Sequence, residues 1–151
     1  MRNSRIGRDL RPQVTEWLGR EHDRLDARLA GLLLQTVWGA EPELQREFQG
    51  YRSELLRHLQ QVERRLFSML VSLDERTRTM EGLEWQSHAR DLQHVFTVID
   101  REVSQRKRAA LYGHFDELRR VLRRHRLHEE RLLALVALPP METPAVAEAF
   151  L

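Results

Sequence analysis

The stretch from Leu111 to Val136, LYGHFDELRRVLRRHRLHEERLLALV, repeats interior-type residues every three or four positions. This spacing matches the 3.6-residue period of an α-helix, and the residues between are mostly charged. The helix face that it defines carries six apolar side chains and two polar ones: Leu111, Phe115, Leu118, Leu122, His125, Glu129, Leu132 and Val136. Because Pro139 and Pro140 follow, we predict one long amphipathic helix that ends before them.

Three earlier segments of the chain show the same period. They run from Pro12 to Gly39, from Pro42 to Leu73, and from Trp85 to Val103. No alternating strand pattern competes with them. The connections are short: we expect a loop over the charged stretch 74–79 and a weakly patterned link over 104–110. Four such segments predict an all-α fold, an antiparallel up-down-up-down four-helix bundle.

The length of 151 residues fits one domain. We assign 12–138 to the bundle, 1–11 to a flexible basic arm and 139–151 to a Pro-containing tail. The chain has no cysteine, which excludes disulfides and thiolate metal sites. No run approaches the ~18 apolar residues of a membrane span. Acidic and basic residues are interleaved, with a net charge of only +2, which disfavours nucleic-acid binding. A soluble cytoplasmic protein without membrane or nucleic-acid partners is expected.

Each of the four apolar stripes contains one histidine at an interior position. These are His22, His58, His88 and His125. A single histidine on such a face is usually a satisfied core residue. Four of them, one per helix, fit a single layer of the bundle at the helical rise of ~1.5 Å per residue. We expect the remaining histidines, His94, His114 and His128, to lie on the surface.

Glu129 follows His125 by four residues and therefore shares its helix face. A buried carboxylate without a partner costs on the order of several kcal/mol, so something must compensate its charge. A metal cation does so, and imidazole with carboxylate suits iron or zinc. An ion pair with one of the many arginines is the structural alternative.

These segments together resemble the hemerythrin-like family, four-helix bundles that hold non-haem iron between histidines and carboxylates. The matching stretches are EHDRLDARLAGLL (21–33), HLQQVERRLFSML (58–70), SHARDL (87–92) and HRLHEERLL (125–133), and the likeness covers 13–137. The resemblance implies one or two iron ions. It implies that the ligands are His22, His58, His88, His125 and Glu129.

The resemblance breaks at one position of the second helix. The family carries His-x-x-x-Glu there, and its glutamate commonly bridges two metals, but this chain has Val62, which cannot ligate. Glu63 is the first candidate to supply the missing carboxylate as a metal ligand, if the helix rotates or contains a π-bulge. Asp26 and Glu54 are alternatives, and Asp26 could instead orient His22. For Glu63 and Glu54, a surface ion pair with an arginine is the structural alternative.

Three functions remain open. The first is an iron protein that binds or senses O2, NO or peroxide in a site shielded by apolar neighbours. The second is an enzyme of the same family, but no nucleophile–base pair or substrate cleft can be read from the sequence, so a non-enzymatic role is preferred. The third is a bundle that has lost its metal and serves as an interaction or regulatory module, which Val62 favours.

Overall fold

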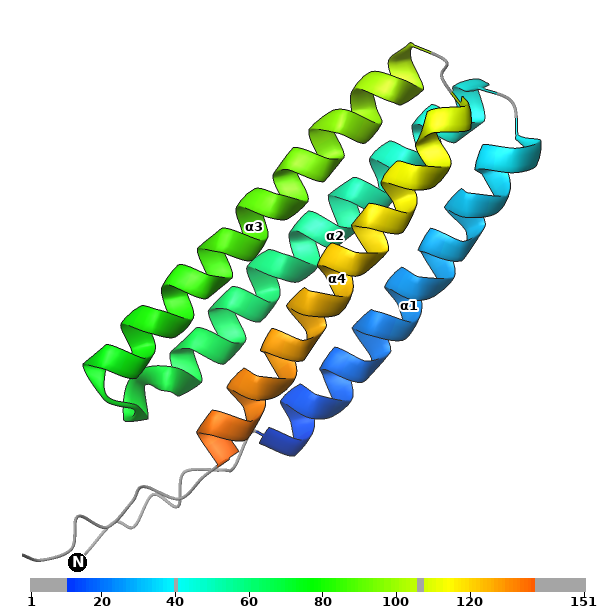
Figure 1. Cartoon of the computed structure of the whole chain (residues 1–151). Helices are drawn as coiled ribbons and strands as arrows, with labels where there is room; N and C mark the ends of the chain where they lie inside the picture. Colours follow the sequence, from blue (N-terminus) through cyan, green and yellow to red (C-terminus); the bar gives the residue numbers. More distant parts are fainter. Residues whose placement is uncertain (1–10, 40, 106–107, 138–151) are drawn as a thin grey trace, which may run out of the picture.

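The computed structural model describes residues 11–39, 41–105 and 108–137. The chain forms four long helices and one short 3-10 helix: α1 (Arg11–Trp38), α2 (Glu41–Met69), η1 (Leu70–Ser72), α3 (Glu75–Ser104) and α4 (Arg108–Ala137). These described residues contain no strand, so the all-α four-helix bundle predicted from the periodicity is confirmed (Figure 1). The predicted basic arm, apart from Arg11, and the predicted tail lie outside the described residues.

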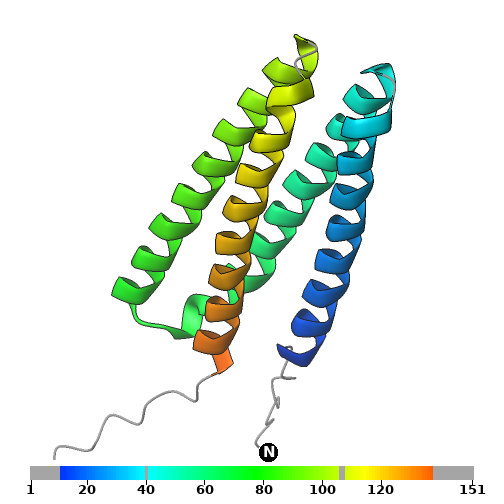
Figure 2. The ribbon, with the colours of Figure 1, turned by 45° about the vertical axis from the view of Figure 1, so that its right-hand side comes forward.

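Consecutive helices run in opposite directions along the bundle (Figure 1). Helix α3 packs against α4, and α1 packs against α2 (Figure 2). Helix α4 contacts each of the other three helices. A side chain on the inner face of α4 can therefore meet residues from the whole bundle. No described helix is long and apolar enough to cross a membrane.

The loop predicted over 74–79 is wrong, because α3 already begins at Glu75. Asp74 caps this helix. Its Oδ1 accepts a hydrogen bond from the backbone N–H of Thr77 at 2.9 Å, and its Oδ2 accepts one from the Thr77 hydroxyl at 2.7 Å. Such a cap satisfies a backbone donor that has no partner within the helix. The first turn lacks apolar periodicity because it is largely exposed.

The apolar core is divided into two clusters along the bundle. The larger one is built around Phe48, Phe96 and Phe115, whose rings meet edge to face with centroids 6.3 and 6.4 Å apart. The smaller one contains seven buried residues, Val14, Leu18, Val62, Leu66, Leu70, Trp85 and Leu132. Burial of these apolar side chains is the main force that holds the helices together.

A layer of polar side chains separates the two clusters. In α1, His22 lies between Leu18 of the smaller cluster and Leu25 of the larger one. The other helices repeat this arrangement with His58, His88 and His125. Buried polar groups are normally paired, so these histidines require polar partners within the layer.

Candidate metal centre

Glu129 is completely buried in the polar layer, with 0 % of its surface exposed. Imidazole nitrogens from three helices approach its carboxylate. His22 Nε2 lies 2.7 Å from Oε2. His58 Nε2 and His125 Nε2 lie 3.4 and 2.6 Å from Oε1. We call these four residues the Glu129 cluster. The ligand atoms of His22, His58 and Glu129 all lie within 4.8 Å of one another, close enough to share one cation.

The imidazoles keep Glu129 in its charged form. Burial raises the pKa of its carboxyl, but the interactions with His125, His22 and His58 outweigh burial and bring the pKa well below the ordinary value. The pKa of Arg126 is raised, first by its hydrogen bond to Asp26 and further by the charge of Glu129. Glu129 is therefore ionised at neutral pH and available as an anionic ligand.

A small cavity of about 10 Å³ adjoins the Glu129 cluster. Its lining comprises the cluster, three leucines, a tyrosine and an arginine: His22, Leu25, Tyr51, Leu55, His58, Leu122, His125, Arg126 and Glu129. A volume of this size holds about one water-sized group. Burial raises the pKa of Tyr51, so its phenol stays protonated at neutral pH. The cavity suits an ion or a very small molecule and has no room for a larger substrate.

Neighbouring side chains orient His58 towards Glu129. Its Nδ1 lies 3.6 Å from Oε2 of Glu21. On its other side, the ring of Trp17 stacks on the imidazole with centroids 6.0 Å apart, and the guanidinium carbon of Arg65 lies 4.2 Å from the centre of the Trp17 ring. A carboxylate near the outer nitrogen of an imidazole is a common support of metal-ligating histidines. This packing directs Nε2 of His58 into the bundle.

The hydrogen-bonding state of the buried atoms fits a bound cation. Nε2 of His125 is only 2.6 Å from Glu129, but the contact does not have the geometry of a hydrogen bond, and both ring nitrogens of His125 are buried without a hydrogen-bond partner. A cation beside Glu129 would supply the partner that Nε2 of His125 lacks. The ligand atoms that could share it, from His22, His58 and Glu129, are imidazole and carboxylate donors that iron and zinc accept.

A second polar cluster lies beside the first. The prediction that His128 lies on the surface is wrong, because only 1 % of the residue is exposed. Its Nε2 lies 2.6 Å from Oε2 of Glu81 and 3.9 Å from Oε2 of Glu84. His88 Nε2 lies 3.9 Å from Oε1 of Glu84. The ligand atoms of Glu84, His88 and His128 lie within 4.8 Å of one another, and together with Glu81 they form what we call the Glu84 cluster.

Arg131 supplies a positive charge to the Glu84 cluster, where it pairs with Glu84 and lies 3.0 Å from Glu81. Burial raises the pKa of Glu81, but its hydrogen bonds with Arg131 and His128 lower it more, so Glu81 is ionised. Burial lowers the pKa of His88, and the neighbouring imidazoles His128 and His125 lower it further. Its ring is therefore neutral at neutral pH and keeps a lone pair, the form that ligates metals.

The two clusters meet at Trp85, whose ring contacts His125 of the Glu129 cluster and His128 of the Glu84 cluster. The ring centroids of Trp85 and His125 are 4.5 Å apart, and the Trp85 ring lies 6.0 Å from that of His128. His88 and His125 meet edge to face at 6.0 Å. The two clusters are thus adjacent parts of one polar layer, joined by aromatic contacts.

The structure brings together four of the six residues predicted to ligate metal, His22, His58, His125 and Glu129. His88 lies in the neighbouring Glu84 cluster instead. Glu63 is exposed and belongs to neither cluster. Val62 is fully buried in the smaller apolar cluster and does not line the cavity beside Glu129.

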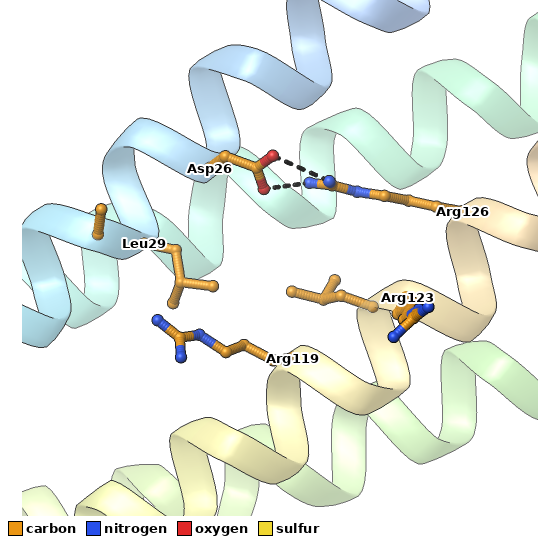
Figure 3. A pocket seen from close by; sticks show the side chains of 7 residues that line it. Asp26, Leu29, Arg119, Arg123 and Arg126 are labelled. Carbon is orange, nitrogen blue, oxygen red and sulfur yellow. Dashed lines mark hydrogen bonds and ion pairs between the residues drawn. The ribbon is translucent and has the colours of Figure 1, made fainter.

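The two other acids considered for the missing carboxylate are engaged elsewhere. Asp26 pairs with Arg126 of α4 through both carboxylate oxygens, one of them at 2.9 Å (Figure 3). This pair lines an open pocket of about 380 Å³ between α1 and α4. Glu54 pairs with Arg28 at 3.3 Å. Neither acid contacts the Glu129 cluster.

A second stripe of helical spacing in the sequence could have predicted the Glu84 cluster. On α4, positions 121, 125, 128 and 132 are spaced by four, three and four residues, as regularly as the stripe that contains Glu129. On α3, positions 81, 85, 88 and 92 repeat this spacing. Val121 and His128 are both buried, so the inner face of α4 is wider than one stripe. A helix that contacts three neighbours requires such a face.

No family model matches the chain, and no curated protein or solved structure matches it either. The resemblance to the hemerythrin-like family therefore stays a prediction made from motifs. The functional conclusion rests on the geometry of the two clusters.

Proposed function

We propose that this chain is a hemerythrin-like, non-haem iron-binding protein that binds or senses a small ligand such as O2, NO or peroxide. One observation carries the proposal: Nε2 atoms from three helices approach a carboxylate that is fully buried and ionised. His22, His58, His125 and Glu129 would hold the metal. Imidazole and carboxylate ligands suit ferrous or ferric iron, which supplies redox chemistry and affinity for diatomic ligands.

The surroundings of the Glu129 cluster favour a small ligand. The cavity beside it is about 10 Å³, and Leu25, Leu55 and Leu122 provide its apolar lining. Apolar walls limit the access of water and so influence the redox potential of a bound metal. Tyr51 and Arg126 also line the cavity, and both carry protons on polar atoms at neutral pH. They are the groups placed to donate hydrogen bonds to a ligand held there.

A metal-free interaction or regulatory module is the second candidate. It is favoured by Val62, which occupies the position of a family glutamate, and by the His22–Glu129 contact of 2.7 Å, which pairs the buried carboxylate without a cation. In this case the polar layer would be an internal hydrogen-bond network that fixes how the helices pack.

Metal loading separates the two candidates. The purified chain would be loaded with Fe²⁺ under anaerobic conditions, desalted, and assayed for iron per chain and for its absorption spectrum before and after addition of NO or O2. We expect bound iron and a spectral change on ligand addition. His58→Ala should lose the spectral change, whereas His94→Ala, which alters an exposed histidine, should retain it. A chain that is fully helical but takes up no iron would refute the proposal.

A further inference from the structure

The Glu84 cluster has the composition of a metal site, although neither its acids nor His128 were among the residues predicted to bind iron. Its carboxylates, Glu84 and Glu81, lie four and seven residues before His88, so all three side chains share one face of α3. His128 faces them from α4.

The distances within this cluster are close to those of a coordinated ion. The ligand atoms of Glu84, His88 and His128 lie within 4.8 Å of one another. Two atoms that each bind a cation at about 2.1 Å are at most about 4.2 Å apart. Nε2 of His88 and Nε2 of His128 each lie 3.9 Å from a carboxylate oxygen of Glu84, which is within this limit.

His88 is the residue whose surroundings are least explained without a cation. It is 4 % exposed, and its Nε2, which faces the cluster, lies 3.9 Å from Oε1 of Glu84, beyond hydrogen-bond distance. Its Nδ1 is also buried without a partner. Arg131 pairs with both acids but makes no contact with His88 that would satisfy the imidazole. Buried imidazoles normally have a polar partner. A cation between His88, His128 and Glu84 would provide it for the Nε2 that faces Glu84.

The net charge of the Glu84 cluster also favours a bound cation. Glu81 and Glu84 bring two negative charges, and Arg131 neutralises one of them. The remaining negative charge lies beside two buried imidazoles, His88 and His128. A divalent cation balances such a site, and two imidazoles with one or two carboxylates suit Zn²⁺, Fe²⁺ or Mn²⁺.

We infer that Glu84, His88 and His128, supported by Glu81, form a second binding site for a first-row divalent metal ion. This goes beyond the proposed function, because the site shares no ligand with the Glu129 cluster and can bind whether or not that cluster does. It also gives the chain a second metal position. The acids of this position come from α3, whereas α2 has Val62 at the position of the family glutamate.

Metal stoichiometry tests the inference. Wild-type protein and variants would be dialysed against Co²⁺ or Zn²⁺ and analysed for metal per chain, with circular dichroism to verify folding. We expect two ions in the wild type, and one each in Glu84→Gln and Glu129→Gln. The double variant should bind none. His94→Gln and Glu130→Gln, both at exposed positions, are the matched controls and should bind two.

The outcomes distinguish this site from the Glu129 cluster. One ion in the wild type, kept by Glu84→Gln and lost by Glu129→Gln, would overturn the second site and leave the proposed function intact. One ion kept by Glu129→Gln and lost by Glu84→Gln would support the second site alone. A folded wild-type protein that binds no metal would overturn both. His88→Gln provides a second variant, and it should lower the Co²⁺ affinity of the site at least about 10-fold.

Discussion

Replacement of Glu129 by glutamine tests whether the buried carboxylate is a metal ligand. Glutamine keeps the size of the side chain and one acceptor oxygen but removes the charge. The neighbour Glu130 is exposed, so Glu130→Gln is a matched control that removes the same charge one residue away. We expect Glu129→Gln to fold, because it removes the desolvation cost of a buried charge together with the contacts to His22 and His125.

The size of the effect follows from linkage. A metal that binds only the folded chain, at 100 times its Kd, adds about 2.7 kcal/mol to the free energy of unfolding. Loss of an outer partner of a metal ligand typically weakens binding by about 10–100-fold. Glu129 is at the centre of its cluster, so we expect at least the upper value. A Kd raised 100-fold leaves about 0.4 kcal/mol at the same metal concentration, a loss of about 2.3 kcal/mol.

Urea unfolding followed by far-ultraviolet circular dichroism, with and without Zn²⁺ or anaerobic Fe²⁺, measures this loss. The difference between wild type and variant is the relevant quantity, because an ion at the Glu84 cluster stabilises both. Glu130→Gln should gain as much stability from metal as the wild type does. If Glu129→Gln gains as much as the wild type, or if Glu130→Gln loses as much as Glu129→Gln, the carboxylate is not a ligand.

Three further predictions use residues outside the two clusters. Asp74→Ala should lower the melting temperature at pH 7. Hydrogen bonds from Thr77 lower the pKa of Asp74 below 3.8, so the cap is fully stabilising above that pH and is lost as the pH falls through the lowered value; thermal melts of variant and wild type should converge in acid. Val62→Glu should reduce the free energy of unfolding of the metal-free protein by about 3–5 kcal/mol in urea titrations, because it places an unpaired charge in the smaller apolar cluster. Glu63→Ala and Asp26→Asn should leave metal affinity within about 2-fold of wild type in a chelator competition, since both acids lie outside the Glu129 cluster.

The parts of the structure that sequence reasoning predicted correctly are those set by periodicity. The interior positions of His125 and Glu129 follow from helical spacing alone, and the burial of both residues agrees with it. The start of α3 was missed because its capping residue, Asp74, precedes an exposed turn that shows no apolar pattern. His128 was missed because one stripe was assigned to a helix that contacts three others.

The pairing of acids with histidines of another helix could not be predicted from spacing within one helix. Spacing within a helix shows which residues share a face, so it places Val62, whose side chain has no donor atom, in line with His58, and it places Glu63 on the flank. It does not show which acid of another helix lies opposite a given histidine. The pairing of Glu81 with His128 joins α3 to α4 and depends on the relative height of two helices, which is set by the packing of the whole core.

We propose metal binding rather than stability as the role of the polar layer. Buried ionic clusters can often be replaced by apolar side chains without loss of stability, and this bundle already has apolar clusters on both sides of the layer. A layer needed only for packing specificity would also be expected to pair its own groups. Here buried ring nitrogens of His88 and His125 have no hydrogen-bond partner, and the acids of the Glu84 cluster outnumber the arginine that neutralises them. A cation in each cluster would give the Nε2 atoms of His88 and His125 a partner and would balance the excess negative charge.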